Sequence, residues 1–159
     1  MLHQAAVLGD TGVINGLLMD KVDTDVLDKD QCTPLCLAIR QENYSASLSL
    51  IEGGADINKG GGIFGSPLHL AIVRLKVHII EALVEKKANL NRKDSDGNTP
   101  VHLIMNIFSK NPERCKHILN ILIFNGANIN DRNSDHWAPI HSAIRKNQEM
   151  AIQAIIKMN

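Results

Sequence analysis

Apolar residues recur along the chain in quartets with the spacing i, i+1, i+4 and i+5, and polar or glycine-containing stretches separate them. These four positions share one face of an α-helix, so each quartet predicts an amphipathic helix. The quartets are Val13, Ile14, Leu17 and Leu18; Ala46, Ser47, Leu50 and Ile51; Ile79, Ile80, Leu83 and Val84; Ile118, Leu119, Leu122 and Ile123; and Ala151, Ile152, Ile155 and Ile156. The second quartet is the most polar, so its helix is expected to be the weakest link in the fold.

A second pattern precedes the later quartets. It reads Ser66-Pro67-Leu68-His69-Leu70-Ala71, and related segments begin at Thr33, Thr99 and Ala138. The first three start at 33, 66 and 99, a constant step of 33, whereas the fourth starts at 138, six residues later than that step predicts. A hydroxyl before proline predicts a helix start, because the hydroxyl caps a free amide and proline presets the first helical φ. Ala138 cannot provide this cap.

A 33-residue period with a Thr-Pro-Leu-His core resembles the ankyrin repeat family over essentially the whole chain. The resemblance implies an all-α ankyrin-repeat solenoid of stacked helix-turn-helix units, with short β-hairpin or finger loops between them. We expect one domain over residues 1–159, divided into repeats at about 1–28, 29–61, 62–94, 95–133 and 134–159. The six extra residues, near 108–113, are expected to lengthen the loop between the two helices of the fourth repeat. The clearest hairpin turn is expected at Asp96-Gly97.

The resemblance also implies where a partner binds, namely the concave side made by the fingers and the first helix of each repeat. At these positions acids gather in the fingers and bases follow the first helices, while the family pattern leaves the residue types free. Tryptophan and arginine often dominate interface energies. Two alternatives stay open: the arginines form only a solvated face, or Trp137 packs along its own finger. The candidate partner-binding residues are Arg40, Gln41, Ile63, Phe64, Val73, Arg74, Asp96, Asn98, Asn106, Ile107, Asp135, Trp137, Arg145 and Lys146.

Composition narrows the classes of partner. The 17 basic and 17 acidic residues cancel, and the pI of 7.0 gives no overall positive field, so nucleic acid is not an expected partner. No run reaches about 18 apolar residues, so membrane insertion is not expected either. The odd count of three cysteines favours reduced thiols. We therefore expect an intracellular, cytoplasmic protein, with the nucleus left open.

No pattern predicts catalysis, so the chain is not expected to be an enzyme or to carry a cofactor. Gly60, Gly62 and Gly65 match a dinucleotide-binding spacing, but no apolar strand precedes them, and a glycine-rich finger is the preferred interpretation. The recurring histidine of the Pro motif is expected to be structural, bonding the backbone of a neighbouring turn. Cys36 replaces that histidine in the second repeat and should remove one such bond. No cysteine spacing indicates a metal site.

The sequence therefore predicts a non-enzymatic protein–protein interaction module or scaffold that binds a peptide segment or domain surface. The alternative is a regulatory or targeting arm of a larger enzyme or channel, because the fifth repeat ends in an ordinary internal pattern and suggests part of a longer protein. A monomer is expected, with end-to-end self-association left open. Modification of the hairpin asparagines Asn58, Asn91 and Asn130 is also left open.

Overall fold

The computed structural model describes residues 1–157, which contain α-helices, short 3₁₀ turns and loops but no β-strand. The expected all-α class is therefore confirmed, and the expected hairpins are turns without paired strands. Within the described residues, no helix has the length and apolar character needed to cross a bilayer. The chain divides into two compact units, Met1–Ala88 and Asn89–Asn159. The expected grouping of all repeats into one domain stays a prediction.

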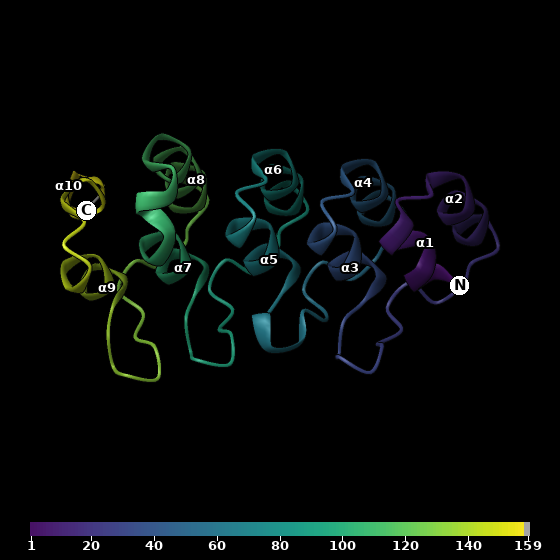
Figure 1. Ribbon diagram of the computed structural model, residues 1–159, viewed down its shortest axis with the longest axis horizontal. Helices are drawn as coiled ribbons and strands as arrows, with labels where there is room; N and C mark the ends of the chain where they lie inside the picture. Colours follow the sequence, from purple (N-terminus) through teal and green to yellow (C-terminus); the bar gives the residue numbers. More distant parts are fainter. Residues whose placement is uncertain (158–159) are drawn as a thin grey trace. The chain divides into compact units, whose positions relative to one another are not determined.

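The first unit is made of three helix pairs. In each pair the first helix packs against the first helix of the next pair, and the second helices pack in a separate row (Figure 1). The finger loops lie on the side of the first row. The helices are α1 (Leu2–Leu8), α2 (Thr11–Met19), α3 (Pro34–Arg40), α4 (Tyr44–Glu52), α5 (Pro67–Val73) and α6 (Val77–Glu85), with a 3₁₀ turn, η1 (Gly62–Phe64), before α5.

The second unit repeats this arrangement with two helix pairs. Its first-row helices α7 and α9 pack together, and its second-row helices α8 and α10 pack together (Figure 1). The helices are α7 (Pro100–Ile107), α8 (Pro112–Phe124), α9 (Pro139–Arg145) and α10 (Glu149–Lys157), with a second 3₁₀ turn, η2 (Phe108–Lys110), between α7 and α8.

The predicted helix starts are confirmed at their caps. The Thr33 hydroxyl accepts the Cys36 amide at 3.3 Å, and the Ser66 hydroxyl accepts the His69 amide at 3.4 Å. These bonds satisfy amides that have no partner inside the helix. Ala138 offers no such oxygen, and its own amide donates instead to Nδ1 of His141 at 3.1 Å.

The apolar quartets supply most of the buried stripe in α4, α6 and α8, whereas Val13 of α2 and Ile156 of α10 are exposed, by 41% and 61%. Ile79, Ile80, Leu83 and Val84 are all buried in α6, and Ile118, Leu119 and Leu122 are buried in α8. The polar member of the second quartet, Ser47, is also buried, and its hydroxyl donates to the Asn43 carbonyl at 2.8 Å. That bond limits the desolvation cost of the serine, although its hydroxyl still replaces apolar contact.

The six-residue insertion does not form the simple loop that we expected. Elsewhere the first helix ends in a tight turn with one residue at positive φ, as at Glu42, Leu75 and Asn147. In the fourth repeat α7 instead runs on into η2, and α8 has 13 residues where α4 and α6 have 9. Phe108, within the insertion, is only 2% exposed. The insertion thus forms a 3₁₀ turn and a longer α8, and it places Phe108 in the core while Ser109, Lys110 and Glu113 stay exposed.

The finger turns also differ from the expected two-residue hairpin at Asp96-Gly97. The Gly97 amide donates to the Asp94 carbonyl, and the Asp94 amide donates to the Asn98 carbonyl, both at 3.0 Å. The central turn residues are thus Ser95 and Asp96, and Gly97 follows them at φ +75°. The two other regular fingers have the same pair of backbone bonds, with Gln31 and His136 in the place of Gly97.

The glycine-rich finger before α5 has its own conformation. Gly61, Gly62 and Gly65 all have positive φ, and the Gly62 amide donates to the Gln31 carbonyl of the preceding finger at 3.2 Å. A Cβ on Gly62 would lie 2.5 Å from the Asp30 carbonyl oxygen. The backbone of one finger thus rests directly on the backbone of its neighbour, a contact that only glycine permits.

Because of this contact, alanine should destabilise the first unit more at Gly62 than at a glycine whose surroundings are open. Gly62→Ala is expected to lower the free energy of unfolding by about 2 kcal/mol, from left-handed strain and the backbone clash together. Gly54 is the matched control, because it has φ +89° but open space around its Cβ position. Gly54→Ala should therefore cost about 1 kcal/mol, from strain alone. Urea titrations followed by circular dichroism would compare them, and equal losses would argue against the clash.

Candidate functional site

Two finger loops of the second unit hold an exposed acid each. Asp94 Oδ1 accepts the amides of Asp96 and Asn98, at 2.9 and 2.8 Å. Asn133 Oδ1 does the same for the amides of Asp135 and Trp137, at 3.1 and 3.0 Å. These side chains close each loop from inside, and they fix the backbone from which the Asp96 and Asp135 carboxylates project.

The two fingers are also joined to each other. The Ser134 amide donates to the Asp96 carbonyl at 3.1 Å, and the Asn133 side-chain amide donates to Asn98 Oδ1 at 3.0 Å. Because backbone and side-chain bonds act together, the two fingers form a single braced wall within the second unit.

His102 connects this wall to the helices. Its Nδ1 accepts the Thr99 amide at 3.1 Å, so Nε2 carries the proton and donates to the Trp137 carbonyl at 2.8 Å. The ring is fully buried, and that burial lowers its pKa below the ordinary value of 6.5. His3 makes the equivalent bond to the Cys32 carbonyl in the first unit, at 3.2 Å. The expected structural role of this histidine is confirmed at both positions.

Two bases lie at the end of α9, facing the fingers. The Arg145 guanidinium carbon is 5.1 Å from the centre of the Trp137 ring, within the range of a cation–π interaction. The Lys146 ammonium donates to the Asn106 carbonyl of α7 at 2.9 Å. Both side chains remain exposed. Each base is therefore held in place by a neighbour that does not neutralise its charge.

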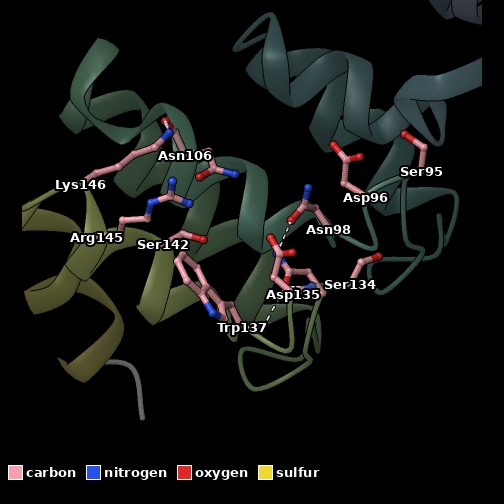
Figure 2. Close-up of a pocket in the computed structure, with 11 residues that line it drawn as sticks. Ser95, Asp96, Asn98, Asn106, Ser134, Asp135, Trp137, Ser142, Arg145 and Lys146 are labelled. Carbon is pink, nitrogen blue, oxygen red and sulfur yellow. Dashed lines mark hydrogen bonds between the residues drawn. The ribbon is translucent and has the colours of Figure 1, made fainter.

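These groups surround one pocket of about 310 Å³. Figure 2 shows the finger residues and the α9 residues on its two sides, with the Trp137 side chain between them. Its lining is polar and carries charges of both signs. The lining residues are Ser95, Asp96, Asn98, Asn106, Asn133, Ser134, Asp135, Trp137, Ser142, Arg145 and Lys146.

Seven of the eight candidate residues in the second unit line this pocket. The eighth, Ile107, is 9% exposed and packs into the core rather than lining the pocket. Four further residues that were not among the candidates also line the pocket, namely Ser95, Asn133, Ser134 and Ser142, of which Asn133 and Ser142 lie outside the positions that the repeat leaves free. A signal existed for both: Asn133 opens its finger as Asp94 does, and Ser142 stands three residues before Arg145 on one helix face.

The candidate residues of the first unit are arranged differently. Lys76 donates to the Glu42 carboxylate at 2.6 Å and Arg74 approaches it at 3.8 Å, and these contacts, that of Lys76 above all, lower the pKa of Glu42. Ile63 and Phe64 are 73% and 43% exposed at η1, so they do not fold back onto the helices. Gln41 and Val73 are exposed at the ends of α3 and α5, and Arg40 is half-buried. Part of the expected positive charge is thus neutralised within the unit.

The three thiols are all free and buried. We expected the cysteine at position 36 to remove the bond that histidine makes to a neighbouring backbone. That expectation is wrong, because the Cys36 thiol donates to the Lys59 carbonyl at 3.7 Å, a weak replacement for the histidine contact. Burial raises the pKa of the Cys36 thiol to about 11, so this thiol stays protonated and unreactive near neutral pH. Among residues 1–157, no three His, Cys, Asp or Glu side chains are grouped as a metal site would require.

Comparison with known proteins agrees with the repeat pattern of the sequence and with the helix pairs of the structure. The ankyrin repeat family profile matches residues 66–95 and 96–134. Mouse Inversin is 31% identical over 103 residues, which cover 64% of this chain and 10% of Inversin. Mouse Rabankyrin-5 is 34% identical over 99 residues, covering 55% of this chain and 8% of that protein. Mouse ankyrin repeat and SOCS box protein 9 is 30% identical over 103 residues, which cover 65% of this chain and 35% of that protein. The chain thus spans only a small part of these relatives.

Proposed function

The chain is an ankyrin-repeat protein, and from that premise we propose that it is a non-enzymatic module that binds another protein through the pocket of its second unit. Ankyrin repeats are generally protein–protein interaction modules and are generally not catalytic. The bound element is a peptide segment or a domain surface that lies between the fingers and α9.

One observation carries the proposal: a braced pocket holds a half-exposed tryptophan and four charged side chains that form no ion pairs among residues 1–157. Fixed side chains lose little conformational entropy when a partner arrives, and this supports tighter binding. Trp137 and Arg145 are also of the residue types that most often carry interface energy. By contrast, the candidate arginine Arg74 of the first unit is paired with Glu42 and offers less.

The test is a comparison of two charge-reversed baits. Arg145→Glu/Lys146→Glu changes the pocket, whereas Arg114→Glu/Lys116→Glu makes the same charge change at exposed positions of α8. Both baits and the wild type would be used to capture partners from a cell lysate, after circular dichroism shows that each variant folds. We expect proteins held by the wild type and the α8 variant to be lost, by about tenfold or more, from the pocket variant.

Direct titration of each identified partner with the three purified baits would follow. Partners that bind all three equally would contradict the proposal, since the pocket would then make no contribution. Partners lost from the α8 variant alone would move the binding surface to the second-row helices.

The other expectations about function, location and oligomeric state also remain proposals, and they have less support from the structure. A regulatory or targeting arm of a larger enzyme or channel could use the same pocket, so no observation favours it over the simple module. A cytoplasmic location, a monomeric state and the exclusion of nucleic acid as a partner rest on composition. Fractionation, sedimentation and a salt titration of any nucleic-acid binding would test them in turn.

A further inference from the structure

The charges of the pocket are segregated rather than mixed. Asp96 and Asp135 come from the fingers, and Arg145 and Lys146 come from the end of α9. Figure 2 shows the two carboxylates on one side of the pocket and the two bases on the other. The pocket therefore has an acidic side and a basic side, which we call the acid wall and the base wall.

Each wall is held in place by contacts with neutral groups rather than by ion pairs with the other wall. The acid wall is braced by the Ser134 amide on the Asp96 carbonyl, and the base wall by the Trp137 ring and the Asn106 carbonyl. In the first unit, by contrast, an arginine and a lysine share the single carboxylate of Glu42, which offsets part of their charge. In the second unit, the described residues contain no ion pair that crosses between the walls.

This arrangement selects against partners of a single charge sign. A polyanion drawn to the base wall would meet the two carboxylates, and a polycation drawn to the acid wall would meet the two bases. Like charges brought together in a partly desolvated interface cost several kcal/mol, whereas complementary pairs fix orientation and register. A segment with one acid and one base close together satisfies both walls at once.

Resting on the proposed function, we propose that the pocket binds an extended peptide segment in which an acidic and a basic side chain lie on the same side of the backbone. The acid contacts Arg145 and Lys146, and the base contacts Asp96 and Asp135. In an extended chain, residues i and i+2 point the same way, so this spacing presents both side chains together. The volume of about 310 Å³ stands at the low end of ligand sites and suits a few side chains.

The chain contains its own probe for this proposal. Trp137 is the only tryptophan of the 159 residues, and its side chain lines the pocket beside Arg145. Its fluorescence therefore reports occupancy without any label. The probes are capped octapeptides of glycine and serine that carry Glu and Lys two residues apart, titrated to millimolar concentration. Their controls replace Glu, Lys or both with Gln, and oligoglutamate and oligolysine of the same length test single-sign ligands.

We expect the mixed-charge peptide to bind at least about fivefold more tightly than either single-charge control, and this advantage to shrink in high salt. Asp96→Asn/Asp135→Asn should abolish the preference for Lys but keep the preference for Glu. Arg145→Gln/Lys146→Gln should do the reverse. Glu113→Gln/Lys116→Gln, on α8, is the matched control and should change neither.

Equal binding of all peptides would overturn the proposal, as would oligoglutamate or oligolysine that matches the mixed peptide. The lysate comparison separates this failure from that of the proposed function. If partners depend on Arg145 and Lys146 but the mixed peptide has no advantage, the binding surface stands and the charge pattern is wrong. If partners and peptides are both indifferent to the pocket, both proposals are wrong.

Discussion

Phe108→Ala is expected to lower the free energy of unfolding by about 4 kcal/mol, although Phe108 belongs to the six-residue insertion. The side chain is 2% exposed, and its 3₁₀ turn η2 contacts both α7 and α8. Truncation of a buried phenylalanine removes its transfer energy and leaves a cavity, which together cost about 3–5 kcal/mol. Urea denaturation followed by Trp137 fluorescence is the measurement, because Trp137 lies in the same unit.

Phe124 provides the control within the same chain. It is 92% exposed at the last turn of α8, so Phe124→Ala should change the free energy of unfolding by less than about 0.5 kcal/mol. A loss below about 1 kcal/mol for Phe108→Ala would show that the insertion is a loose loop after all. A large loss for Phe124→Ala would mean that its ring is covered in solution.

His102→Ala is expected to cost about 3 kcal/mol and to loosen the finger that carries Trp137. The substitution leaves the Thr99 amide and the Trp137 carbonyl without their partner, and each unsatisfied buried group costs about 1–3 kcal/mol. His141 occupies the same slot of the fifth repeat and accepts the Ala138 amide, but its exposed ring has no counterpart to the Trp137 carbonyl, so His141→Ala should cost less, about 1 kcal/mol. Urea denaturation compares the two, and similar losses would contradict the role given to the Trp137 carbonyl.

The same histidine predicts a pH dependence. Because burial lowers the pKa of His102 below 6.5, the unfolded chain binds the proton more readily than the folded chain. The contribution is therefore complete above pH 6.5 and is lost as the pH falls through the lowered pKa. Asp28 behaves similarly only below its ordinary value of 3.8, because the amides of Cys32 and Asp30 lower its pKa. Urea midpoints of wild type and His102→Gln from pH 7.5 to 5 should thus converge as the pH falls.

The candidate site was only partly predictable, for a physical reason. Finger positions and positions at the end of each first helix recur with the repeat, so the sequence could indicate that Asp96, Asp135 and Arg145 stand at neighbouring places. It could not indicate whether their charges are already neutralised, because that depends on distances between side chains from different repeats. Arg74 and Lys146 have the same place in their repeats, directly after α5 and α9, yet Arg74 approaches Glu42 whereas Lys146 donates to the Asn106 carbonyl.

The amino-acid sequence by itself determined the local structure of this protein. The Thr-Pro and Ser-Pro caps and the 3.6-residue apolar stripes act over a few neighbouring residues, and the 33-residue step repeats them along the chain, so each can be recognised without the fold. Only the tertiary structure decided that Phe108 is buried, that the fingers brace one another and that the walls of the pocket stay unpaired. Those outcomes depend on which side chains meet across helix pairs, and burial and charge pairing are properties of that meeting.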